Sequence, residues 1–107
     1  MSHRGVDMIP LTITVGASGT ASASFKTKLG IIFLVCVKPS STNSSYALEF
    51  FSPGGFGLDG RPDDGSAVIT GNRTFESLIP IIGENTLTIS NATADTYTVE
   101  LYLKAGI

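Results

Sequence analysis

The chain has 107 residues, of which 15% are charged and 42% hydrophobic, and its formal net charge is −2 at pH 7. This length predicts one domain with a single core, and the small negative charge gives no electrostatic basis for binding nucleic acid or an anionic membrane. The shortage of charged residues predicts that partners cover part of the surface, most simply copies of the chain itself. The alternative is a monomer that a serine- and threonine-rich surface keeps soluble.

The N-terminal residues show no periodicity and contain the only histidine, so we predict a flexible arm over residues 1–8 and one domain over residues 9–107. This end has no apolar core of a signal peptide, and no stretch of the chain has the length of a transmembrane helix. Nothing here is expected to direct the chain to a membrane or a secretory pathway. Residues 9–15 then alternate and predict a strand, with Pro10 at a sheet edge or a strand start.

The small residues from Gly16 to Ser24 have two interpretations. They are either a flexible linker or part of a strand in which Ala21, Ala23 and Phe25 face the core. The alternation continues to Phe25 with polar residues between, which favours the strand.

The run from Leu29 to Val37 is the most apolar in the chain and is followed by Pro39. It predicts a strand buried on both faces, one against the core and the other against a subunit neighbour. The only cysteine, Cys36, lies in this run. No internal disulfide can form, and a buried, inert thiol is expected.

A further strand is predicted from Ser44 to Phe51, where Tyr46, Leu48 and Phe50 share a face. The next fifteen residues, Ser52 to Ser66, contain five glycines and two prolines and predict a long exposed loop.

An acidic cluster lies in this loop, at Asp59, Asp63 and Asp64. Its spacing does not fit a calcium loop of the EF-hand type, because Arg61 and Thr70 stand where oxygen ligands are required. We therefore predict a solvated turn and no metal site.

The last third of the chain predicts short strands over residues 67–70 and 73–78, joined by a tight turn at Gly71-Asn72. From Glu84 to Lys104 the period is two on both sides of a polar turn, which predicts a β-hairpin. Seven to eight short strands without a helix are typical of an antiparallel β-sandwich or jelly roll, the predicted fold class.

No arrangement of residues points to catalysis. His3 lies in the arm without a Gly-x-Ser-x-Gly motif, Cys36 has no histidine to activate it, and the chain has no tryptophan to line a sugar site. No catalytic residue, cofactor or small-molecule substrate is predicted, and the chain is not expected to be an enzyme. Three lysines, at positions 26, 28 and 38, flank strands without interleaved aromatic residues and are interpreted as solvated strand ends.

The two ends of the chain, IPLTITVGASGTASAS and NTLTISNATADTYTVELYLK, together resemble a family of small virion proteins of tailed bacteriophages and prophages. Leu11 to Gly16 and Gly83 to Leu103 carry the two signatures, and the middle of the chain is not covered. The family usually has a glycine in the final turn, where this chain has Ala94-Asp95-Thr96.

This resemblance implies a head decoration or cement protein on the capsid exterior, made in the host cytoplasm. Its implied partners are copies of itself, with a trimer favoured, and the major capsid protein. Two alternatives stay open: a tail, neck or fibre protein, and a non-viral carbohydrate-binding or adhesion module.

The predicted interface residues lie at three places in the chain. Those in and next to the arm would contact the shell, those in the long loop are exposed or intersubunit, and one tyrosine near the C-terminus faces outward. This tyrosine could equally cover a neighbouring hydrophobic residue. The residues are His3, Arg4, Met8, Ile9, Phe56, Leu58, Arg61 and Tyr102.

Overall fold

The computed structural model describes residues 6–54, 57–58 and 69–105. Within these ranges no helix is long and apolar enough to cross a membrane. The described strands are β1 (Val6–Val15), β2 (Ala21–Pro39), β3 (Ser45–Phe51), β4 (Gly57–Leu58), β5 (Ile69–Thr70), β6 (Arg73–Ser90) and β7 (Asp95–Ala105). All pairings are antiparallel, and the predicted all-β fold class is confirmed.

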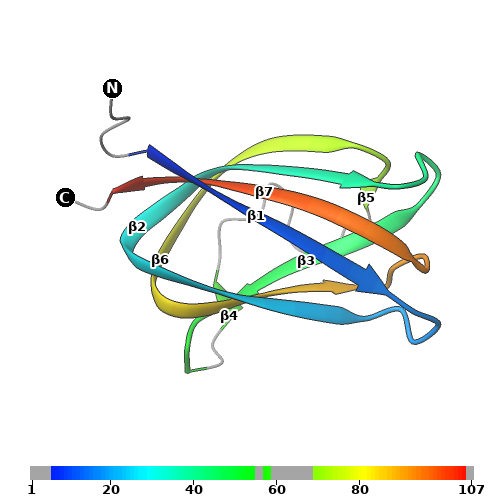
Figure 1. Cartoon of the computed structure of the whole chain (residues 1–107), viewed down its shortest axis with the longest axis horizontal. Helices are drawn as coiled ribbons and strands as arrows, with labels where there is room; N and C mark the ends of the chain where they lie inside the picture. Colours follow the sequence, from blue (N-terminus) through cyan, green and yellow to red (C-terminus); the bar gives the residue numbers. More distant parts are fainter. Residues whose placement is uncertain (1–5, 55–56, 59–68, 106–107) are drawn as a thin grey trace.

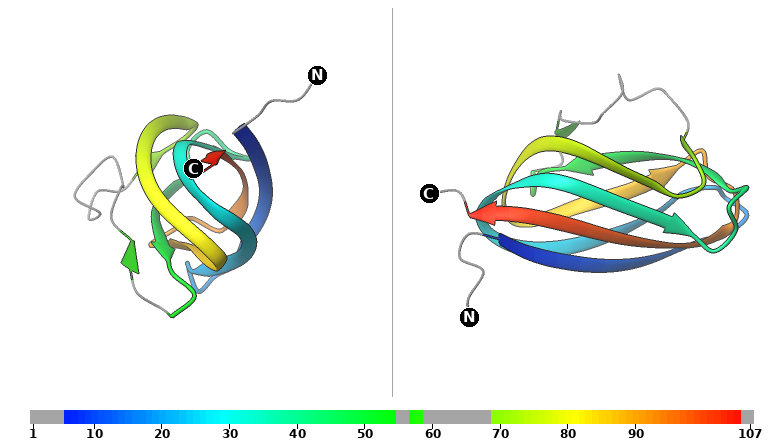
Figure 2. Two further views of the ribbon diagram at one scale, coloured as in Figure 1. Left: turned by 90° about the vertical axis from the view of Figure 1, so that its left-hand side faces the viewer. Right: turned by 90° about the horizontal axis from the view of Figure 1, so that it is seen from above.

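The strands form one sheet in the order β1-β7-β2-β6-β3-β4, with β5 beside β3. The sheet folds over because β2 and β6 are long and bent, as Figures 1 and 2 show. One layer contains β1, β7, the second half of β2 and the first half of β6. The other contains the remaining halves of β2 and β6 with β3 and β4.

The bends have a local cause in β2. Its pairing with β6 shifts register between Thr27 and Gly30, and again between Ile32 and Leu34. Such bulges bend a strand. At Gly30 a Cβ atom would lie 3.0 Å from the backbone oxygen of Lys104, so the bend brings two backbones close together.

The prediction of short strands needs correction here. The apolar run and the small-residue segment before it are two halves of one strand of 19 residues. Residues 73–78 and the first hairpin strand are likewise parts of β6, with 18 residues. The strand β1 begins at Val6, three residues before the predicted start, while residues 1–5 lie outside the described ranges.

The core lies between the two layers and is built from the inner residues of all the long strands. Alternation in β7 places Tyr97, Val99 and Leu101 in the core at 0% exposure, as predicted. The core side chains are Ile13, Val15, Phe25, Ile32, Val35, Val37, Tyr46, Leu48, Phe50, Ile69, Ile79, Ile81, Leu87, Ile89, Tyr97, Val99, Leu101 and Leu103.

Within the single chain, the apolar run is buried on its core face alone. Ile32, Val35 and Val37 are buried, whereas Leu34 and Cys36 on the outer face are half-buried. The reason is that no described element covers the outer face of this layer. The thiol of Cys36 is therefore less buried than predicted.

One end of the sandwich is closed by hydrogen bonds between its loops. The Tyr46 hydroxyl donates to the backbone oxygen of Gly71 at 2.8 Å, and the Tyr97 hydroxyl donates to that of Thr93 at 2.6 Å. The two rings meet edge to face with centroids 5.1 Å apart. Asp95 accepts from the hydroxyl of Ser44 at 2.7 Å, which ties the loop after β2 to β7. We call this the closed end.

Candidate functional site

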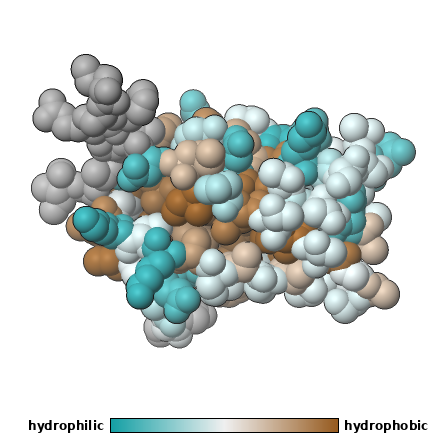
Figure 3. Space-filling view, in the orientation of Figure 1, coloured by the Kyte–Doolittle hydropathy of each residue, from teal (hydrophilic) through white to brown (hydrophobic). Residues whose placement is uncertain are grey.

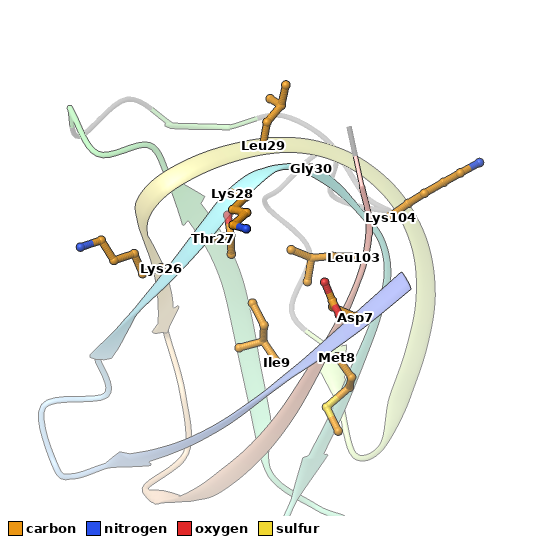
Figure 4. Close-up of a pocket in the computed structure, with 10 residues that line it drawn as sticks. All are labelled: Asp7, Met8, Ile9, Lys26, Thr27, Lys28, Leu29, Gly30, Leu103 and Lys104. Carbon is orange, nitrogen blue, oxygen red and sulfur yellow. The ribbon is translucent and has the colours of Figure 1, made fainter. Parts of the chain in front are cut away.

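The opposite end of the sandwich contains a cleft of about 690 Å³ between the start of β1, the bend of β2 and the end of β7. Figure 4 shows its residues and the way that Ile9 and Leu103 point into it from the two sides. The lining residues are Asp7, Met8, Ile9, Lys26, Thr27, Lys28, Leu29, Gly30, Leu103 and Lys104. We call this hollow the end cleft.

The rim of the end cleft is positively charged. Lys26, Lys28 and Lys104 are exposed around it, with Asp7 as the only carboxylate among the lining residues. None of the three ammonium groups forms an ion pair within the described part of the chain. The formal charge of the lining residues alone is therefore +2, while Glu84, the cross-strand partner of Lys26, lies next to them. Such a rim attracts an anionic ligand.

Two buried oxygen atoms near the end cleft have no hydrogen-bond partner in the described structure: Thr27 Oγ1, on the lining, and Asn85 Oδ1. The inner face of β2 carries Phe25, and Asn85 pairs with Phe25 across the sheet, so Thr27 and Asn85 are diagonal neighbours on the inner face. Buried polar atoms in folded proteins are normally satisfied. These two oxygens can accept hydrogen bonds from a bound group.

Next to the end cleft, β1 and the first half of β2 lie side by side without pairing to each other in the described structure, and we call the interval between these two strands the gap. Among the described strands, this half of β2 pairs only with β6 and β1 pairs only with β7, so no described strand occupies the two edges that border the gap. Ile9, Leu11, Ala21 and Ala23 contact the core from these strands and are only partly buried. Figure 3 shows the resulting apolar surface across the middle of this face.

The side chains of the end cleft are suited to binding. Its ionisable groups are ammonium groups and one carboxylate, which contribute charge, and its apolar residues contribute contact area. Within the described ranges no three or more His, Cys, Asp or Glu residues are grouped so that they could hold a metal ion.

The structure brings two of the predicted interface residues together, because Met8 and Ile9 both line the end cleft. Tyr102 lies on the outer face of β7, where its hydroxyl donates to Glu100 Oε1 at 3.0 Å; this bond raises the pKa of Tyr102. The backbone of Leu58 pairs with Phe50 in the sheet. The other predicted residues, His3, Arg4, Phe56 and Arg61, and the acidic cluster at 59–64 lie outside the described residues.

Sequence reasoning missed the lysines of the end cleft. Lys26 and Lys28 were interpreted as solvated strand ends, and Lys104 was not singled out. The signal that could have predicted them is Gly30, which follows Lys26 and Lys28 closely within an apolar strand. A glycine inside a strand often marks a bend, and here the bend would have lysines beside it.

Seven chains of solved structures are similar to this chain, among them PliG and PirA. No protein-family model matches the chain, and no curated protein matches it. Aeromonas hydrophila PliG, a periplasmic lysozyme inhibitor of g-type lysozyme, is 13% identical with a TM-score of 0.47, over 95% of this chain and 89% of PliG. PirA is 12% identical with a TM-score of 0.46, over 89% of this chain and 92% of PirA.

These findings correct the virion interpretation. The two similar structures described above are an enzyme inhibitor and PirA, and neither is a phage head protein. The predicted decoration or cement role was therefore wrong. So were the predicted partners, which were copies of the chain in a homo-oligomer, with a trimer favoured, and the major capsid protein, and the predicted locations, the capsid exterior and host cytoplasm. The resemblance misled because its signatures are alternating β patterns, and any antiparallel sandwich needs such patterns in its first and last strands.

Proposed function

We propose that this chain is a non-catalytic binding module that holds an acidic, apolar segment of a partner protein in the end cleft. The observation that carries the proposal is a set of three exposed lysines that line an apolar hollow and have no ion-pair partner among the described residues. A carboxylate of the partner placed near these lysines gains charge-assisted contacts, and its apolar side chains cover the partly exposed floor.

The shape favours a chain segment over a compact small molecule. The volume of about 690 Å³ is within the range of small-ligand sites, but the hollow lies at one end of the gap between β1 and β2. A segment in extended conformation can occupy both. The partly buried Ile9 and Leu11 then lie along its length.

The test is a selection of yeast-displayed random peptides on the purified protein, followed by binding measurements with two double variants. Lys26→Glu with Lys28→Glu reverses the charge of the end cleft. The matched control, Lys38→Glu with Arg73→Glu, makes the same change in net charge at two exposed residues away from the end cleft.

We expect the selected peptides to combine Asp or Glu with apolar residues, to bind wild type and the control, and to lose at least about tenfold in affinity for the cleft variant. Basic peptides, or equal loss in both variants, would contradict the proposal. A g-type lysozyme, the enzyme that PliG inhibits, joins the panel as one folded protein. Binding of it that survives the cleft variant would place its site elsewhere on the chain.

A further inference from the structure

We infer that the bound segment joins the sheet as an additional strand along the free edge of β2, paired with residues 22–26. This inference rests on the proposed function and adds the mode of recognition. Its basis is the direction in which the backbone groups at each edge of the gap point. That direction follows from hydrogen bonds elsewhere in the sheet.

The direction in β2 follows from β3 and β6. Both backbone groups of Ser45 point to Thr93, just beyond the end of β6. The Ser45 oxygen accepts from the Thr93 amide at 2.8 Å, and the Ser45 amide donates to the Thr93 hydroxyl at 3.1 Å. In an antiparallel sheet alternate residues face the same neighbour. Ala47 therefore faces its partner Ser90, so the even-numbered residues of β6 face β3 and the odd-numbered ones, such as Ile89, face β2.

The consequence for β2 is a row of free backbone groups. Ala21, Ala23 and Phe25 pair with odd-numbered residues of β6 and use their backbone groups there. Between them, Ser22 and Ser24 turn their N–H and C=O groups to the gap, and so does Lys26. These three residues are exposed, and β2 pairs with no other described strand at these positions.

The opposite edge, in β1, is a poorer template. The amide of Ser40 donates to the Thr96 oxygen at 3.0 Å, so even-numbered residues of β7 face β2 and odd-numbered ones face β1. Pro10, paired with Glu100, therefore turns its backbone to the gap. Proline has no N–H group to donate, so the free edge of β1 is interrupted in the middle.

The side chains along the gap suit an added strand. Ala21 and Ala23 are small, so another backbone can approach this part of β2 closely. Alternate side chains of the added strand would face inward against Ile9 and Leu11. At the end of this edge Lys28 is an exposed lining residue of the end cleft, while the Lys26 side chain extends away from the hollow (Figure 4). The occupant is therefore an extended segment that alternates apolar residues and carries acidic residues at one end.

The probe is the acetylated, amidated peptide EEVTVTV, with its acidic end set for antiparallel pairing opposite the two lysines. The first readout is amide hydrogen exchange by NMR on the full chain. We expect exchange at Ser22, Ser24 and Lys26 to slow by about tenfold or more on binding, and exchange at Thr12 and Thr14 to stay unchanged. Protection at the β1 amides in place of the β2 amides would overturn the inference.

The second readout is the affinity of two proline variants. Ser24→Pro removes a donor from the free edge of β2 without removing a bond to β6, and Thr12→Pro is the matched change on the edge of β1. We expect Ser24→Pro to weaken peptide binding by about tenfold and Thr12→Pro to leave it unchanged. If Ser24→Pro does not fold, as judged by circular dichroism, the exchange experiment decides alone.

The two proposals fail differently. Strand addition would be rejected, and the proposed function retained, by a combination of three results. The Lys26/Lys28 charge variant would lose binding, Ser24→Pro would bind normally, and the amides at the β2 edge would show no protection. Normal binding to the charge variant would reject the proposed function itself.

Discussion

The closed end allows a direct test of the energetics derived from this fold, through the change Tyr46→Phe. Tyr46 is fully buried, and its hydroxyl donates to the Gly71 backbone oxygen at 2.8 Å. Phenylalanine keeps the edge-to-face contact with Tyr97 but leaves that oxygen without this donor. A buried acceptor that loses its partner costs about 1–3 kcal/mol, so we expect the free energy of unfolding to fall by about 2 kcal/mol.

The matched control is Tyr102→Phe, the same chemical change on the outer face of β7. There the hydroxyl donates to Glu100 Oε1 at 3.0 Å, on a half-buried residue beside solvent. We expect a loss within about 0.5 kcal/mol. The measurement is urea unfolding at pH 7 with equal m values for all three proteins. A cost for Tyr102→Phe as large as that for Tyr46→Phe would refute the reasoning.

The same variant has a signature in alkali. Burial, with a smaller contribution from Tyr97, raises the pKa of Tyr46 from 10.0 to about 12, while Arg73 opposes the shift. A raised pKa means that the folded state binds this proton more tightly than the unfolded state. The stabilisation is complete below pH 10 and is lost as the pH rises towards 12. Tyr46→Phe should therefore show a shallower fall in stability over this range than wild type.

Two further predictions concern the same end of the sandwich. Gly71→Ala should lower the free energy of unfolding by about 2 kcal/mol in urea, because Gly71 has a φ of 76° and a Cβ atom there would lie 2.9 Å from the backbone oxygen of Thr42. The control Gly16→Ala places its methyl group in open space and should lower it by less than about 0.5 kcal/mol. Equal losses for the two variants would contradict this prediction. Hydrogen bonds from Ser44 and from the Ser41 amide lower the pKa of Asp95, so its stabilisation is present above 3.8 and is lost as the pH falls through the lowered pKa. Asp95→Asn should make acid unfolding, followed by circular dichroism, less steep, and an unchanged acid profile would argue against this role.

Local patterns were sufficient to predict the strand type and the faces of the regular segments. In β7 the alternation placed Tyr97 and Val99 in the core, because a strand without bulges keeps its period of two. The final turn was also predictable in kind: Asn91 adopts a positive φ of 47°, which short polar side chains tolerate.

The bends and the end cleft could not be predicted in the same way. A bulge shifts the alternation by one residue, and the shift depends on the partner strand as well as on the local sequence. Leu29 illustrates this: it continues the odd-numbered alternation of Phe25 and Thr27 but is 47% exposed, because the register of β2 shifts between Thr27 and Gly30. The end cleft exists only because β7 pairs with the second half of β2 and leaves the first half free, a non-local choice.

The two ends of the sandwich differ in how well their polar groups are hydrogen-bonded, and this difference supports binding at the end cleft in addition to the presence of the cleft itself. At the closed end, loop polar groups such as the hydroxyls of Tyr46 and Tyr97 have partners within the chain. At the end with the end cleft, Thr27 Oγ1 and Asn85 Oδ1 are buried without hydrogen-bond partners in the described part of the chain, where residues 22–26 of β2 also have a free edge. Unsatisfied buried groups reduce stability unless something else satisfies them. A ligand that bonds to the edge of β2 and reaches these oxygens would supply what the chain lacks at this end.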